Sequence, residues 1–321
     1  MTVGKAFELL VKYILINVGF SEVKSDGVYI FDGTPGQMVN GLGEAHNADV
    51  LLEPPVQVPF FSMTRLLVEC KHYTGKRVGL GVIRGVLGLR DDVNVFNILD
   101  DKELQRRLIQ NRKGSVFYNR YYYNVAVASR SGFTDQAQNM AAAYRIPLID
   151  FRNYTFWRNW ENILMDIEEK KREISEKDIA DFVLDICKGM AVAVTNTGQF
   201  LFLYSKEDTV SFPKNTYDIK WADDNKTLIL LFDKKQYVVN FPSIMVNHWI
   251  ENEVEVSHFT SDNMSRMVAY YKEKGSPKIE VLKIETDKLR SVIRIQDRGR
   301  VSEGSSIKKI DGDTTTYYVS E

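Results

Sequence analysis

The chain has 321 residues, of which 44% are hydrophobic and 26% are charged, and its formal net charge is −1. This is the composition of a globular protein, and it excludes disordered, collagen-like and coiled-coil proteins. The longest early apolar run, residues 13–16, is far shorter than the roughly 18 residues of a membrane helix. Lys5, Glu8 and Lys12 interrupt any signal peptide, and two cysteines exclude a disulfide scaffold. We therefore expect a cytoplasmic protein of two domains without a membrane partner.

Helices and strands alternate over the first half, which favours an α/β layered domain. Apolar residues at helical spacing predict helices, and short apolar runs between turn residues predict strands. In chain order, the predicted elements are a helix over 3–18, strands over 28–31, 49–52 and 65–71, a helix over 82–89, a strand over 122–128, a helix over 134–144 and a strand over 146–149.

The pattern changes after Asp150. Charged amphipathic patterns predict helices over 157–172 and 175–188, the second with Ser175 as its N-cap. An antiparallel set of strands is predicted over 200–204, 217–221, 228–232 and 237–241, followed by a helix over 264–274 that ends at Gly275. The predicted organisation is an α/β domain over 1–152, a helical connector over 153–189, a β-rich α+β domain over 190–298 and a flexible tail over 299–321.

The strand predicted over 65–71 ends in two charged residues. Alternation places Glu69 and Lys71 on one face and Cys70 on the other. Asp49 stands at the edge of an earlier apolar run, so two carboxylates and a lysine could converge at strand ends. Mg²⁺ is held in this way by one or two carboxylates with water and phosphate, and a metal so placed can assist phosphodiester hydrolysis.

Acid-x-lysine pairs are common in this chain, so the pattern alone is weak. Asp218 and Lys220 form the same pattern in another predicted strand. A structural ion pair between Glu69 and Lys71 is the alternative interpretation of the favoured pair.

A basic and aromatic segment contains no acidic residue between Glu103 and Asp135. Basic side chains such as Arg112 and Lys113 could neutralise phosphates, and the interleaved tyrosines could stack on bases. The alternative is a solvated loop that leads into a buried strand.

Several linked runs resemble a known family: LVECKHY at 67–73, VIRGVLG at 82–88, ASRSGFT at 128–134 and IPLID at 146–150. In order and spacing, residues 4–152 resemble the catalytic core of Mrr-like restriction endonucleases, members of the PD-(D/E)xK nuclease superfamily. The resemblance implies a restriction-endonuclease-like fold, a mixed sheet flanked by helices. It also implies a Mg²⁺ cofactor, which Mn²⁺ could replace, and DNA as the substrate.

Carried over to this chain, the resemblance implies that Asp49 and Glu69 hold the metal together with the backbone carbonyl of Cys70, and that Lys71 is the catalytic lysine. Glu8 on the first helix matches an acid that many relatives place near the metal. His72 and Arg84 would contact DNA phosphates, as would Arg112 and Lys113.

The leading prediction is a metal-dependent endonuclease that hydrolyses DNA phosphodiester bonds. The alternative is a nuclease-fold module without catalysis that binds DNA or assembles with other proteins. RNA or branched DNA as the substrate, a homodimer, and a protein partner of the β-rich domain stay open.

Overall fold

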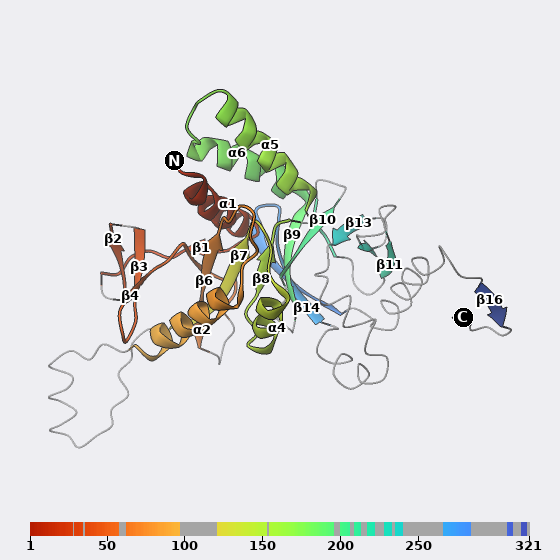
Figure 1. Ribbon diagram of the computed structural model, residues 1–321, viewed down its shortest axis with the longest axis horizontal. Helices are drawn as coiled ribbons and strands as arrows, with labels where there is room; N and C mark the ends of the chain where they lie inside the picture. Colours follow the sequence, from red (N-terminus) through yellow and green to blue (C-terminus); the bar gives the residue numbers. More distant parts are fainter. Residues whose placement is uncertain are drawn as a thin grey trace, which may run out of the picture.

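The computed structural model describes residues 1–27, 29–34, 36–57, 62–96, 121–152, 154–195, 200–205, 209–212, 217–221, 228–232, 235–239, 266–283, 307–310 and 316–319. Its helices and strands form two main sheets with helices packed around the first (Figure 1). In the parts of the chain just given, none of the helices is long and apolar enough to cross a membrane.

The first sheet has five strands in the order β1-β5-β6-β7-β8. Its strands are β1 (Ser21–Glu22), β5 (Val50–Glu53), β6 (Met63–Lys71), β7 (Tyr121–Ser129) and β8 (Leu148–Asp150). β1, β5 and β6 are antiparallel neighbours, whereas β6, β7 and β8 run parallel. The predicted mixed sheet is therefore confirmed.

Helices cover both faces of this sheet. α1 (Val3–Asn17) lies on one face, and α2 (Leu80–Val95) and α4 (Asp135–Ala143) belong to the hydrophobic cluster of the other. Side chains alternate along the central strand accordingly: Val68 packs toward α1, and Leu67 packs toward α2. Because β6 is covered on both faces, most of its middle residues are apolar.

A small antiparallel sheet of β2 (Ile30–Gly33), β3 (Gly36–Asn40) and β4 (Ala45–Asn47) precedes β5. The sequence predicts one strand over 28–31 here, and the structure has a three-stranded sheet that begins at Ile30. The missed strands are short and rich in glycine and polar residues, so they carry no clear two-residue period.

The second sheet is antiparallel and has seven strands in the order β11-β12-β13-β10-β9-β14-β15. Its strands are β9 (Met190–Thr195), β10 (Phe200–Ser205), β11 (Tyr217–Trp221), β12 (Leu228–Phe232), β13 (Lys235–Val239), β14 (Arg266–Glu273) and β15 (Ser276–Lys283). The predicted β-rich second half is confirmed, with three additional strands, β9, β14 and β15.

The helix predicted over 264–274 is wrong, because this segment forms strand β14. Lys274 and Gly275 both have positive φ, at 50° and 81°, and join β14 to β15. Two such residues make a tight hairpin turn, so Gly275 is a turn residue and does not end a helix. β14 also pairs with β9 on its other side, and this pairing decides the structure of a segment with no strong helical period.

Two helices connect the sheets: α5 (Thr155–Glu169) and α6 (Glu176–Ile186), the latter followed by the 3₁₀ turn η1 (Cys187–Gly189). Both helices are as predicted, and Ser175 accepts the Asp178 N–H as the expected N-cap of α6. Figure 1 shows α5 and α6 beside α1. In the segment predicted to be a tail, β16 (Ile307–Ile310) and β17 (Thr316–Val319) pair as a hairpin.

Candidate active site

Asp49 is placed opposite Glu69 by the register of two antiparallel strands. Val50 of β5 pairs with Val68 of β6, so the next residues outward are Asp49 and Glu69. One oxygen of Asp49, Oδ2, accepts the backbone N–H of Cys70 at 2.8 Å. The other, Oδ1, accepts from the Asn47 side chain at 3.3 Å. These contacts fix the carboxylate at the end of β6.

Lys71 is the last residue of β6, and its ammonium Nζ contacts Glu69 Oε1. The two side chains are 25% and 20% exposed, so the pair is largely shielded from water. Burial disfavours the charged ammonium, but the bond to Glu69 and the charges of Glu69 and Asp49 outweigh it and raise the pKa of Lys71. Lys71 is therefore a fixed positive charge at neutral pH.

Burial raises the pKa of Asp49 to about 6. The Cys70 N–H and the Lys71 charge oppose this shift, and the negative charges of Glu69 and Glu8 add to it. The carboxylates thus lie close enough to repel one another. Glu8 of α1 belongs to this group electrostatically, although it also forms an ion pair with Lys5 at 2.7 Å.

Cys70 packs its side chain with the α1 cluster, on the opposite face from Glu69. Burial and the nearby acids Asp49, Glu8 and Glu69 raise the pKa of its thiol well above the usual value. A protonated, packed thiol is a poor nucleophile, which agrees with its predicted role as a small core residue.

Of the predicted DNA-contacting residues, the structure describes His72 and Arg84. The His72 ring packs 5.5 Å from Phe7, and among the residues that the structure describes its buried Nε2 has no hydrogen-bond partner, so this atom does not face a surface phosphate. Burial and the charge of Arg130 lower the pKa of His72. Arg84 is exposed on α2. Arg112 and Lys113 lie outside the described residues.

The structure describes the basic and aromatic segment from Tyr121 onward, where β7 begins. Tyr123 is buried, Tyr121 is half-buried with the Arg65 guanidinium over its ring, and Tyr122 is exposed. For these residues the alternative of a strand leading into the core describes the structure better than an exposed stacking surface.

A basic residue also lies at or just after the end of each of the three parallel strands. The predictions from the sequence do not group these residues into one site. Lys71 ends β6, Arg130 follows β7 and Arg152 follows β8. In the register, Lys71, Ser129 and Asp150 are neighbours across the sheet. Because parallel strands end at the same edge, a basic residue recurring at each strand end is the sequence signal that could have found this group.

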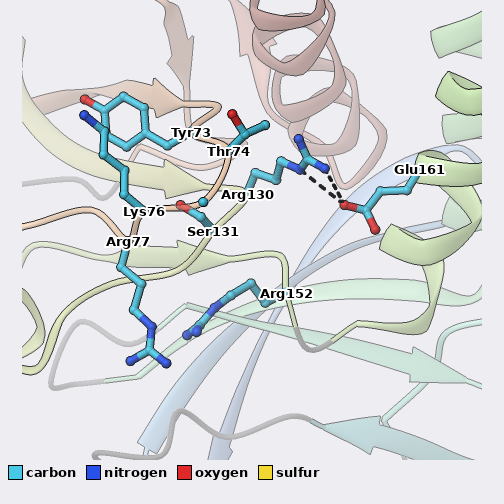
Figure 2. Close-up of a pocket in the computed structure, with 9 residues that line it drawn as sticks. Tyr73, Thr74, Lys76, Arg77, Arg130, Ser131, Arg152 and Glu161 are labelled. Carbon is cyan, nitrogen blue, oxygen red and sulfur yellow. Dashed lines mark hydrogen bonds and ion pairs between the residues drawn. The ribbon is translucent and has the colours of Figure 1, made fainter. Parts of the chain in front are cut away.

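A cavity of about 420 Å³ opens at this edge (Figure 2). Its lining includes the basic residues Lys76, Arg77, Arg130 and Arg152. Arg130 pairs with Glu161 of α5 at 3.0 Å, and Arg152 pairs with Asp150 at 2.6 Å.

No protein-family model matches this chain, and no curated protein matches it. One solved structure, described as the crystal structure of a protein of unknown function, AF1548, is similar over 56% of this chain and 95% of its own. The sequence identity is 12% and the TM-score is 0.31. A likeness of this degree supports no conclusion on fold or function.

Proposed function

We propose that this protein is a Mg²⁺-dependent endodeoxyribonuclease of the Mrr-like restriction type. The proposal is supported by a mixed sheet whose second and third strands are antiparallel and whose last three are parallel, with helices on both faces. This arrangement is consistent with a restriction-endonuclease-like fold. In such a fold, Asp49, Glu69 and Lys71 would lie at one edge of the sheet.

The observation that carries the proposal is the 2.8 Å hydrogen bond between the Asp49 carboxylate and the Cys70 N–H. It joins residues 21 positions apart and brings Asp49 to the end of the strand that carries Glu69 and Lys71. Three groups that the sequence pattern could only suggest as neighbours therefore lie at one place.

The residues at this place fit a hard divalent cation. Asp49 and Glu69 supply carboxylate oxygens, and the Cys70 carbonyl is a further oxygen donor on the same strand. In the described parts of the chain, no three His, Cys, Asp or Glu side chains gather as a ready metal-binding group. Mg²⁺ commonly uses only one or two carboxylates with water and phosphate, so two carboxylates suffice.

When bound, the cation would polarise the phosphoryl oxygen and favour attack by water. The protein's own contribution is to hold Asp49 and Glu69 as charged ligands and to keep Lys71 positive beside them. The Lys71 ammonium can neutralise charge that develops on the phosphate or orient the attacking water. Glu8 can orient that water from α1.

The test is nicking of supercoiled plasmid DNA by the full chain with and without Mg²⁺. Wild type is expected to cut only with the metal. Lys71→Ala should lower the rate about 100-fold or more, because the positive charge beside the phosphate is lost. Lys177→Ala, an exposed lysine of α6, is the matched control and should cut like wild type.

The second candidate is a module of this fold that binds DNA without cutting it. The Glu69–Lys71 contact favours it, since a closed ion pair is also a structural feature. DNA binding without Mg²⁺-dependent cutting in wild type would support this candidate. A homodimer, a protein partner of the second sheet and a cytoplasmic location stay predictions.

A further inference from the structure

The cavity beside the candidate active site is built from the ends of three parallel strands. The loop after β6 supplies Lys76 and Arg77, the loop after β7 supplies Arg130 and Ser131, and Arg152 follows β8. Figure 2 shows these side chains around one hollow, with Glu161 of α5 bonded to Arg130. The cavity is thus part of the sheet's carboxyl edge, where α/β proteins bind ligands.

The charge of the cavity is positive even after its ion pairs are counted. Four basic side chains line it, and the carboxylates of Glu161 and Asp150 pair with two of them. Among the residues whose positions are described, neither Lys76 nor Arg77 has a carboxylate within ion-pair distance; Lys76 lies over the Tyr73 ring instead. An excess of positive charge favours an anionic ligand, and guanidinium groups bind phosphate oxygens well.

Ser131, which lines the cavity beside Arg130, has a buried hydroxyl. Within the described parts of the chain, its Oγ has no hydrogen-bond partner. A buried hydroxyl without a partner is unfavourable, and an acceptor-rich ligand would satisfy it. The unprotonated oxygens of a phosphate group accept hydrogen bonds, so they fit guanidinium groups and a serine O–H, which are donors.

The absence of a side chain at Gly132 leaves room for the Arg152 guanidinium against the loop. A Cβ at this glycine would lie 1.9 Å from Arg152 Nε, and Gly132 has a φ of 73°. Arg152 therefore packs closely against the loop at the cavity, and its Nε and Nη2 donate to Asp150, which fixes the guanidinium.

The cavity adjoins the proposed catalytic group through the backbone. The N–H of Arg130 donates to the carbonyl of Lys71 at 3.3 Å, and Tyr73, which lines the cavity, is two residues beyond Lys71. A ligand in the cavity would therefore lie next to the Asp49, Glu69 and Lys71 group along the same edge.

We propose that this cavity is a phosphate-binding site, and that the phosphate it takes is a backbone phosphate of the nucleic acid strand next to the bond that is cut. That the cavity binds phosphate is argued from the cavity alone. That this phosphate belongs to the nucleic acid strand rests on the proposed function. The alternative ligand with the same chemistry is a free phosphate ion.

The first arm titrates inorganic phosphate into the full chain at low salt without divalent metal, followed by calorimetry or by ³¹P line broadening. Arg77→Gln should weaken binding about tenfold, because a charge-assisted contact is lost. Glu161→Gln should strengthen it several-fold, because Arg130 is freed. Arg145→Gln, which removes the same charge before β8 at the other end of that strand, should leave binding unchanged.

Absence of phosphate binding by wild type overturns the site, as does equal weakening by Arg145→Gln and Arg77→Gln. Circular dichroism checks that Arg77→Gln folds. Should it not fold, Glu161→Gln decides: stronger binding supports the site, and unchanged or weaker binding overturns it.

The second arm measures binding of a short DNA duplex and plasmid nicking by the same variants. Arg77→Gln should weaken both about tenfold. If Arg77→Gln loses phosphate binding but keeps full DNA affinity and full cutting, the bound phosphate is not part of the nucleic acid backbone, and the cavity is a site for the free ion.

Asp49→Asn distinguishes a failure of the phosphate site from a failure of the proposed nuclease function. This variant should abolish cutting and keep the phosphate affinity. If neither wild type nor any variant cuts DNA, the nuclease proposal fails, but the phosphate titration still decides whether the cavity binds phosphate.

Discussion

At the scale of single residues, the Asp49 carboxylate is suited to bind a cation but its charge lowers the stability of the folded protein. Its carboxylate is largely buried and close to Glu69 and Glu8, which is why its pKa rises to about 6. An acid with a raised pKa keeps its proton in the folded state to higher pH than in the unfolded state. Its contribution to folding therefore decreases as pH rises from about 4 to about 6.

Asp49→Asn is expected to stabilise the metal-free protein at pH 7.5 by about 1–2 kcal/mol, a range that allows for solvent screening. Asparagine keeps an acceptor for the Cys70 N–H and removes the repelled charge. Denaturant unfolding at pH 7.5 and pH 4 measures this. The gain should be present at pH 7.5 and nearly absent at pH 4; a loss of stability at pH 7.5 would contradict the repulsion between the acids.

Gly132→Ala is a second prediction at this scale. The new methyl group would overlap Arg152, and the φ of 73° is unfavourable for alanine. We expect a loss of about 1–2 kcal/mol in the free energy of unfolding together with weaker phosphate binding. Thermal unfolding and the phosphate titration measure the two effects. Unchanged values of both would show that Arg152 does not depend on this glycine.

The site residues could be predicted only where strand alternation applies. Glu69, Cys70 and Lys71 follow from the period of two along β6, and the structure places them as expected. The position of His72 could not be predicted in this way, because it depends on Phe7 of a helix far away in the sequence. The partner of Arg130, Glu161, is likewise set by the docking of α5.

At the scale of elements, the sequence predicts segments with a strong local period well, whereas it misses the β2–β3–β4 sheet and the β14–β15 hairpin. The α1 and α6 helices carry amphipathic patterns with polar caps, and their predicted bounds agree closely with the structure. β14 was predicted as a helix because the sequence gives no pairing information, and its structure is fixed by β9 and β15 on both sides.

Two glycines of opposite role test this account of the elements. Gly275 has a φ of 81° in the β14–β15 turn, so Gly275→Ala should cost about 1 kcal/mol. Gly85 lies on the exposed side of α2, and beyond its own helix backbone no described residue has an atom within 4 Å of an added Cβ, so Gly85→Ala should gain about 0.5–1 kcal/mol. Thermal unfolding of the two variants should shift in opposite directions; a shift of the same sign would contradict the assigned roles.

At the scale of the whole molecule, the two sheets share one hydrophobic cluster. It runs from Phe7 of α1 through Phe151 after β8 and Trp160 of α5 to Phe202 of β10. The N–H of Phe202 also donates to the Tyr154 hydroxyl at 3.1 Å. Sequence patterns predict a boundary near residue 152, but side-chain packing between remote elements has no local signal.

A chain cut after residue 152 is therefore expected not to unfold cooperatively, because it loses the covering that α5, α6 and the second sheet give to α1 and β8. Far-ultraviolet circular dichroism during heating measures this. A chain cut after residue 283 is the control: β16 and β17, which it lacks, pair only with each other among the described strands, so its transition should be retained. A sharp transition in the 1–152 chain would contradict the shared core.

The proposed endonuclease activity depends on whether Asp49 and Glu69 hold a divalent cation. The most direct measurement is calorimetric titration of the full chain with Mn²⁺ at pH 7.5, above the pKa of Asp49, for wild type and Asp49→Asn. We predict saturable binding by wild type that weakens as pH falls through about 6 and is abolished in Asp49→Asn. Absence of Mn²⁺ binding by wild type, or equal binding by both proteins, would contradict the metal-dependent site.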